Sequence, residues 1–171
     1  GPGGVRLHNM ERSMKKRILY AEASYEAIIE GHGYFVDKTQ YIEKLERIKN
    51  PVFLRPKRFG KSLLCTMLEA YYDIRNKDRF DELFGHTWIG KNPTPLHNSC
   101  FVLHLDMSTV DSSSGNIFDI EHSFNNTCNL RIKKLIRQNS TLFKNEPEIN
   151  IKGRASENLK ALLNSIEEEY L

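Results

Sequence analysis

The sequence predicts an α/β fold of three layers, α/β/α, in which helices cover both faces of a parallel β-sheet. Two observations indicate this fold class. Short apolar runs at Val52–Leu54 and Phe101–Asp106 are typical of buried parallel strands. Amphipathic helical patterns lie between these runs and after them, and such alternation along a chain is typical of a parallel sheet.

The first elements are marked by capping residues. Ser24 is placed to cap a short helix that ends at Gly31–Gly33. Further on, Asp37 has Gln40 three residues later, which is the spacing of a capping box and predicts a second helix. That helix ends at Asn50, because a proline follows. Its apolar face is expected to carry Tyr41, Leu45 and Ile48.

After the first predicted strand and a loop, a third helix is expected to open at Lys61. Apolar residues recur along it at helical spacing: Leu64, Met67, Leu68, Tyr71 and Tyr72. A short helix is predicted over 78–84, and two longer helices, around 119–138 and 156–170, close the chain. We expect Trp88 to lie in the core.

The predicted sheet is too small to be whole. Residues 1–9 are expected to be an expression scar and linker, and residues 10–171 the N-terminal part of one domain. Two strands cannot form a sheet that buries both faces. The last helix also ends in Glu167–Glu169, which places negative charge at the negative end of the helix dipole. We therefore expect the chain to stop before its fold does.

Composition excludes several classes of function. The 25 lysines and arginines are nearly balanced by 22 acidic residues, so bulk charge does not indicate nucleic-acid binding. We expect no membrane partner, because no apolar window reaches the roughly 18 residues of a membrane-spanning helix. The three cysteines have no metal-binding or disulfide spacing, which favours a cytoplasmic protein with reduced, buried thiols.

The loop between the first strand and the third helix carries the chemistry. It reads Arg55, Pro56, Lys57, Arg58, Phe59, Gly60, Lys61 and Ser62. A strand, a loop and a helix N-terminus in this order form a cradle of backbone N–H groups for phosphates. Gly60 lets the backbone approach closely, Lys61 supplies a cation for the β- and γ-phosphates, and the Ser62 hydroxyl is a suitable Mg²⁺ ligand. The loop predicts binding of ATP with Mg²⁺.

The loop departs from the standard pattern, because Arg55 stands where G-x-x-x-x-G-K-[ST] has its first glycine. A bare Gly-Lys-Ser triplet is weak evidence, and the preceding strand and following amphipathic helix strengthen it. Two other interpretations stay open. The loop can be a basic turn in which Gly60 serves geometry alone, or it can contact phosphates of a polymer in a non-catalytic interaction or nucleic-acid-binding module.

The chain resembles a known family over roughly residues 24–110. Residues Phe53–Leu64, continuing into Met67–Ile74, are similar to the predicted AAA-ATPase-like family, whose loop typically reads R-P-[RK]-R-F-G-K-S. Further blocks agree in order: Tyr34–Thr39, Asp81–Gly85 and Leu105–Ser108.

The resemblance implies an incomplete P-loop NTPase domain, an ATPase in the full-length protein and Arg55 as a family feature. Residues Gly60, Lys61 and Ser62 inherit the phosphate and Mg²⁺ roles. It also implies a nuclease-like domain of the PD-(D/E)XK type later in the longer protein, through which nucleic acid would become a partner.

One acidic residue imitates a catalytic element. ATP hydrolysis needs an apolar strand that ends in an acid, and Val102–Asp106 has this shape. However, Met107 follows Asp106 where an acid is usual, and His104 interrupts the apolar run. We expect Asp106 to cap the next turn. The acidic Walker B residues are thus expected to be absent from this chain, the catalytic residues unknown, and hydrolysis by this fragment slight.

Overall fold

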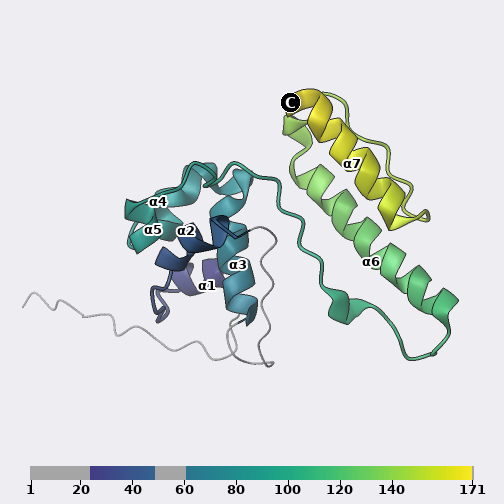
Figure 1. The fold of residues 1–171 in the computed structure, drawn as a ribbon, viewed down its shortest axis with the longest axis horizontal. Coiled ribbons are helices and arrows are strands. Elements are labelled where there is room, and N and C mark those ends of the chain that lie inside the picture. The colour runs from purple at the N-terminus through teal and green to yellow at the C-terminus, as the bar shows by residue number, and fades with distance from the viewer. Residues whose placement is uncertain (1–23, 49–60, 171) are drawn as a thin grey trace, which may run out of the picture.

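The computed structural model describes residues 24–48 and 61–170, and the regular structure there is helical (Figure 1). Residues 24–98, here the helical unit, contain α1 (Tyr25–Glu30), α2 (Gln40–Glu46), α3 (Lys61–Tyr72), η1 (Ile74–Arg79), α4 (Phe80–Phe84) and α5 (Trp88–Lys91). Residues 117–170, here the helix pair, contain α6 (Ile117–Gln138), η3 (Ser140–Leu142) and α7 (Ala155–Tyr170). An extended segment with the short 3-10 helix η2 (Met107–Thr109) joins the two parts.

The predicted three-layer α/β/α fold of P-loop NTPase type is wrong for the residues that the structure describes. Within 24–48 and 61–170 there is no β-sheet, and an isolated parallel bridge joins Asp73 to Cys100. The predicted strand Phe101–Asp106 is extended but pairs with no described strand. Its apolar side chains pack on helices instead, since Phe101 and Leu103 contact the core of the helix pair. The other predicted strand, Val52–Leu54, lies outside the described residues.

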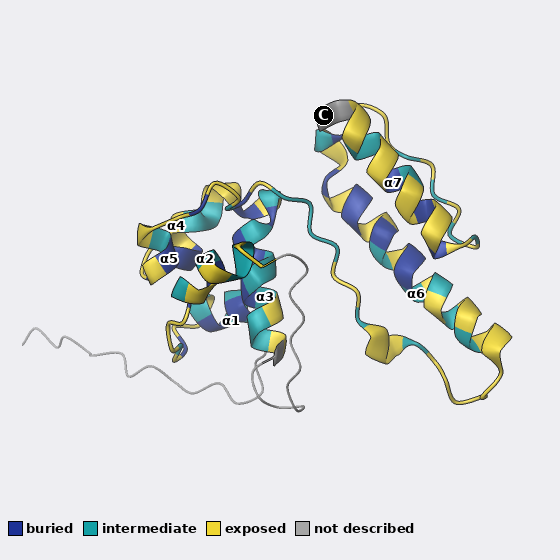
Figure 2. Ribbon diagram, in the orientation of Figure 1, coloured by how far each residue is buried: buried dark blue, intermediate teal, exposed yellow. Residues whose placement is uncertain are grey.

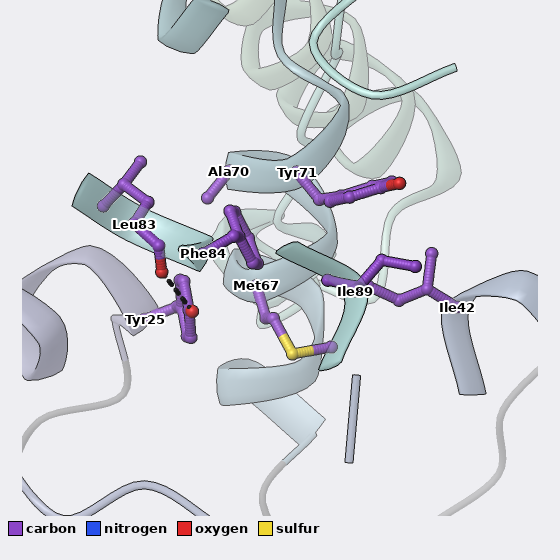
Figure 3. Close-up of a cluster of buried hydrophobic side chains, with 8 residues drawn as sticks. All are labelled: Tyr25, Ile42, Met67, Ala70, Tyr71, Leu83, Phe84 and Ile89. Carbon is purple, nitrogen blue, oxygen red and sulfur yellow. Dashed lines mark hydrogen bonds between the residues drawn. The ribbon is translucent and has the colours of Figure 1, made fainter. Parts of the chain in front are cut away.

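The core of the helical unit is aromatic (Figure 3). Phe84 of α4 stacks on Tyr25 of α1, with ring centroids 4.8 Å apart, and meets the edge of Tyr71 of α3 at 5.4 Å. The Tyr25 hydroxyl donates to the Leu83 carbonyl at 2.5 Å, so its polar end is satisfied inside the core. Met67 and Ala70 complete the α3 contribution. The core therefore fixes α3 against α1 and α4.

A glycine allows α5 to lie close to the end of α4. A Cβ placed on Gly90 would lie 1.8 Å from the Phe84 carbonyl oxygen, a distance that no side chain tolerates. Thr87 holds the same junction, because its hydroxyl donates to the Phe84 carbonyl at 2.7 Å and accepts from the Gly90 N–H at 3.1 Å. This contact brings Ile89 into the core.

In the helix pair, α6 and α7 run in the same direction (Figure 1). Residues 143–154 therefore lead the chain back along the pair to the start of α7. Buried residues gather in the second half of α6, whereas Ile117 and Phe118 at its start are exposed (Figure 2). Despite its 22 residues, α6 has a strongly polar face, and no described helix combines the length and apolarity that a membrane crossing requires. The apolar contacts come from Ile132, Leu135, Ile136, Phe143 and Leu162.

Asparagine side chains join the returning segment to both helices. Asn129 of α6 is fully buried and donates to the carbonyls of Ile151 and Gly153, at 3.2 and 2.8 Å. Its own side-chain oxygen accepts from the Asn158 amide of α7 at 2.7 Å. Asn158 also donates to the Asn150 carbonyl at 2.8 Å. Hydrogen bonds thus help to align α6, α7 and the returning segment, whereas apolar packing aligns the helices of the helical unit.

Candidate functional site

The predicted phosphate-binding loop enters the structure at the start of α3. Residues Arg55, Pro56, Lys57, Arg58, Phe59 and Gly60 lie outside the described residues. The description resumes at Lys61, which is the first residue of α3, and Ser62 follows in the first helical turn with an exposed side chain. The sequence motif therefore continues into a helix N-terminus, where Lys and Ser are expected.

The start of α3 is suited to an anion. The first N–H groups of a helix have no partner within the helix, and the helix dipole adds partial positive charge there. No acidic residue occupies the first turn of α3, so no carboxylate of that turn competes for this end. The exposed Ser62 hydroxyl is a hard oxygen ligand of the kind that Mg²⁺ accepts. These residues fit a nucleotide with Mg²⁺.

Hydrogen bonds hold α3 in place beside α1. The Tyr25 N–H donates to the Thr66 hydroxyl at 3.0 Å, and that hydroxyl donates in turn to the Leu63 carbonyl at 3.1 Å. Thr66 lies little more than one turn after Lys61, close to the end that would receive phosphate. The first residue of α1 therefore helps to set the position of the α3 N-terminus.

The block Asp37–Thr39 has a structural role, in which it links two helices. The Asp37 carboxylate accepts from the Thr39 N–H at 2.9 Å and hydroxyl at 2.6 Å, and from the Trp88 N–H at 2.7 Å. Burial alone would raise the pKa of Asp37, but the hydrogen bonds from Thr39 and Trp88, with nearby His86, lower it below its usual value. Thr39 is fully buried and accepts from the Ile89 N–H at 3.1 Å. One carboxylate thus joins the starts of α2 and α5.

Asp106 caps a turn, as the sequence predicts. Its carboxylate accepts from the Ser108 hydroxyl at 2.6 Å and the Ser108 N–H at 3.0 Å at the start of η2. These two bonds lower the pKa of Asp106, and His104 and Arg131 add to the effect. In the described part of the chain, no group of three His, Cys, Asp or Glu side chains gathers as a metal site. We therefore assign Asp106 a structural role and name no catalytic acid.

Sequence reasoning did not show that, of four basic residues of α6, two line a cavity and two do not. In the sequence, Arg131, Lys133, Lys134 and Arg137 form a basic helix face, which indicates either a solvated surface or a contact with nucleic acid. In the structure, Arg131 and Lys134 line a cavity that also reaches Arg75 and His104, whereas Lys133 and Arg137 do not line it. The i, i+3 spacing of Arg131 and Lys134 places them on one side of the helix, but only the fold shows what lies opposite.

Comparison with known families and proteins gives one match. A family model described as "Predicted AAA-ATPase" matches residues 20–171, which is most of the chain. The searches of curated proteins and of solved structures returned no match. The family match extends beyond the sequence blocks of the helical unit and includes the whole helix pair.

Proposed function

This chain belongs to the predicted AAA-ATPase-like family, and we propose that its residues 55–62 bind the phosphates of ATP together with Mg²⁺. The observation that best supports the proposal is that α3 begins within the sequence motif. The sequence Gly-Lys-Ser runs into α3 at Lys61, with Ser62 exposed and no acid in the first turn. The family of predicted ATPases supplies the class of ligand.

Each residue of the loop has a proposed part in binding. Gly60 allows the backbone to pass close to the phosphates, and Lys61 neutralises the β- and γ-oxygens. Ser62 would hold Mg²⁺, which would neutralise phosphate charge. Arg55, Lys57 and Arg58 add positive charge around the phosphates, and Pro56 and Phe59 complete the loop. The proposal concerns binding, because Asp106 is engaged in its own turn and no other residue is assigned to hydrolysis.

Family resemblance alone supports one further proposal. A nuclease-like domain of the PD-(D/E)XK type in the longer protein would bring nucleic acid to the nucleotide-binding part. No residue of the present chain is assigned to that contact.

Binding of ATP·Mg²⁺ to the wild type and to two lysine variants tests the proposal. Lys61→Ala is expected to weaken ATP binding by about tenfold or more, since a charge-assisted contact to phosphate is lost. Lys77→Ala removes an exposed lysine from η1 and serves as the matched control, with an expected change under about twofold.

The rival interpretation, contact with phosphates of a polymer, predicts different behaviour. Binding would then show no preference for ATP over AMP and would weaken steeply as salt is added. If ATP binds equally to the wild type and to Lys61→Ala, or no better than AMP, the assignment of residues 55–62 is wrong.

A further inference from the structure

A second positively charged site lies away from the loop, at the junction of the helical unit and the helix pair. A cavity of about 90 Å³ is bounded by α3, η1, the extended segment and the second half of α6. Polar side chains line it from all four: Glu69, Arg75, His104, Arg131, Lys134 and Gln138. Glu69 lies eight residues after Lys61, so the cavity is about 12 Å along α3 from the predicted loop.

Two carboxylates, Glu69 in the lining and Asp73 beside it, are already engaged. The Glu69 carboxylate oxygen Oε2 lies 2.9 Å from Nδ1 of the His104 ring, within hydrogen-bond distance. The Arg75 guanidinium is held by the nearly buried Asp73 carboxylate, through contacts of 2.6 and 3.1 Å. This pair fixes the orientation of Arg75 before any ligand arrives, and a guanidinium in a fixed position loses less side-chain entropy on binding.

The two cations from α6 have no such partner. Among the described residues, neither Arg131 nor Lys134 forms a salt bridge. They lie one helical turn apart on the same side of α6, where like charges repel one another. Arg131 lies near enough to Asp106 to affect the pKa of that carboxyl, but the Asp106 carboxylate is hydrogen-bonded to Ser108. The lining holds three cations and one carboxylate, and Asp73 neutralises Arg75 from beside it. Positive charge therefore stays in excess at Arg131 and Lys134, and an anion would relieve their mutual repulsion.

We propose that this cavity binds a single phosphate group, either free or as part of a nucleic-acid backbone. Its volume is well below the roughly 300–1,000 Å³ of pockets that enclose whole small molecules, so one tetrahedral oxyanion fits and a nucleotide does not. Arginine and lysine together are the side chains that bind phosphate most strongly, and the Gln138 amide adds a neutral donor. The site joins α6 to the helical unit, and phosphate would therefore tie the two parts together.

The test measures binding of sodium phosphate by calorimetry to the full 171-residue chain carrying Lys61→Ala, which keeps the predicted loop out of the measurement. Arg131→Gln with Lys134→Gln removes both α6 cations of the cavity. Lys133→Gln with Arg137→Gln is the matched control, because it removes the same charge from the same helix outside the cavity. Lys134→Gln alone, at an exposed position, is a second variant that leaves the packing untouched.

The cavity variant is expected to lose at least about tenfold in phosphate affinity and Lys134→Gln alone about threefold, whereas the control changes by less than about twofold. Anisotropy of a labelled oligothymidylate then separates the two sources. If phosphate displaces the oligonucleotide and the cavity variant releases it, the ligand is a strand. Binding of phosphate without the oligonucleotide indicates a free phosphate or phosphomonoester. If the parent binds no phosphate, or the cavity variant loses no more than the control, the proposal is wrong.

Discussion

The two parts of the molecule reach their folds by different means. In its described residues, the helical unit packs five α-helices of 4 to 12 residues around an aromatic core, and helices this short are marginal when isolated. The helix pair uses helices of 22 and 16 residues, a smaller apolar cluster and a buried asparagine network. The start of α3 therefore depends on contacts spread over several short elements, whereas the helix pair depends on a few hydrogen bonds for its register.

The largest expected effect tests the aromatic core. Phe84→Ala removes a ring that contacts both Tyr25 and Tyr71, and should lower the free energy of unfolding by about 3–5 kcal/mol. Phe143→Ala in the helix pair should cost less, because Phe143 lies in the smaller cluster and stacks on one ring, that of Phe101. Urea unfolding of both variants measures the difference. An equal or larger loss of unfolding free energy for Phe143→Ala would contradict the idea that the helical unit depends more on its aromatic core.

A smaller effect tests the asparagine network. Asn129→Ala leaves the Ile151 and Gly153 carbonyls and the Asn158 amide without their partner, at an expected cost of about 1–3 kcal/mol. Asn126→Ala, one turn earlier and exposed, is the control and should change stability by less than about 0.5 kcal/mol. Thermal unfolding followed by circular dichroism compares them. Indistinguishable melting temperatures would show that the network contributes nothing to stability.

The smallest effect concerns the contact between α2 and α5. Asp37→Asn keeps one oxygen that accepts from Thr39, but it removes the negative charge and the second oxygen, which accepts from the Trp88 N–H. The loss near pH 7 is expected to be about 1 kcal/mol, because the Trp88 N–H loses its partner. The pKa of Asp37 is lowered in the folded chain, so the charged group stabilises the fold above the unfolded value near 3.8. That stability is lost as pH falls through the lower, folded pKa. Unfolding curves from pH 7 to 2 should therefore converge for the two proteins, and a gap that widens toward acid would contradict the assignment.

Local signals predicted most of the helices. Ser24 caps α1 through the Ala27 N–H, Gly31 ends it, and α3 begins at Lys61 as the motif requires. The predicted closing helices 119–138 and 156–170 correspond to α6 and α7. These features depend on residues near one another in sequence, such as caps, periodicity and helix breakers, and so they can be identified from the sequence.

One error is local: the N-cap of α2 is Thr39, without a side-chain cap bond, rather than Asp37, and the helix ends at Glu46 rather than Asn50. The other errors concern contacts between distant residues. In α2 the buried residue is Ile42, while Tyr41 of the predicted face is 50% exposed and Ile48, which lies beyond the end of α2, is 55% exposed. Trp88 was expected in the core but is 38% exposed, because Ile89 beside it points inward. Of the predicted buried thiols, Cys65 is exposed. Which face of a short helix is covered depends on its neighbours, and an isolated pattern of apolar residues does not identify them.

The candidate sites show the same division. The loop 55–62 is proposed as a site from sequence alone, because glycine, lysine and serine have distinct expected roles at fixed spacing. The phosphate cavity could not be found in this way, since Arg75, His104 and Lys134 come from three separate elements. Likewise, Phe101–Asp106 has the apolar pattern of a strand, but the described residues contain no strand for it to pair with, and Phe101 and Leu103 pack on the helix pair instead.

The central claim is that the chain binds a nucleotide through the loop that leads into α3. The ATP affinity of the wild type, measured beside Lys61→Ala and Lys77→Ala in the presence of Mg²⁺, tests it most directly. The account predicts a loss of about tenfold or more for Lys61→Ala alone and a clear preference for ATP over AMP. Equal ATP affinity in all three proteins would contradict it.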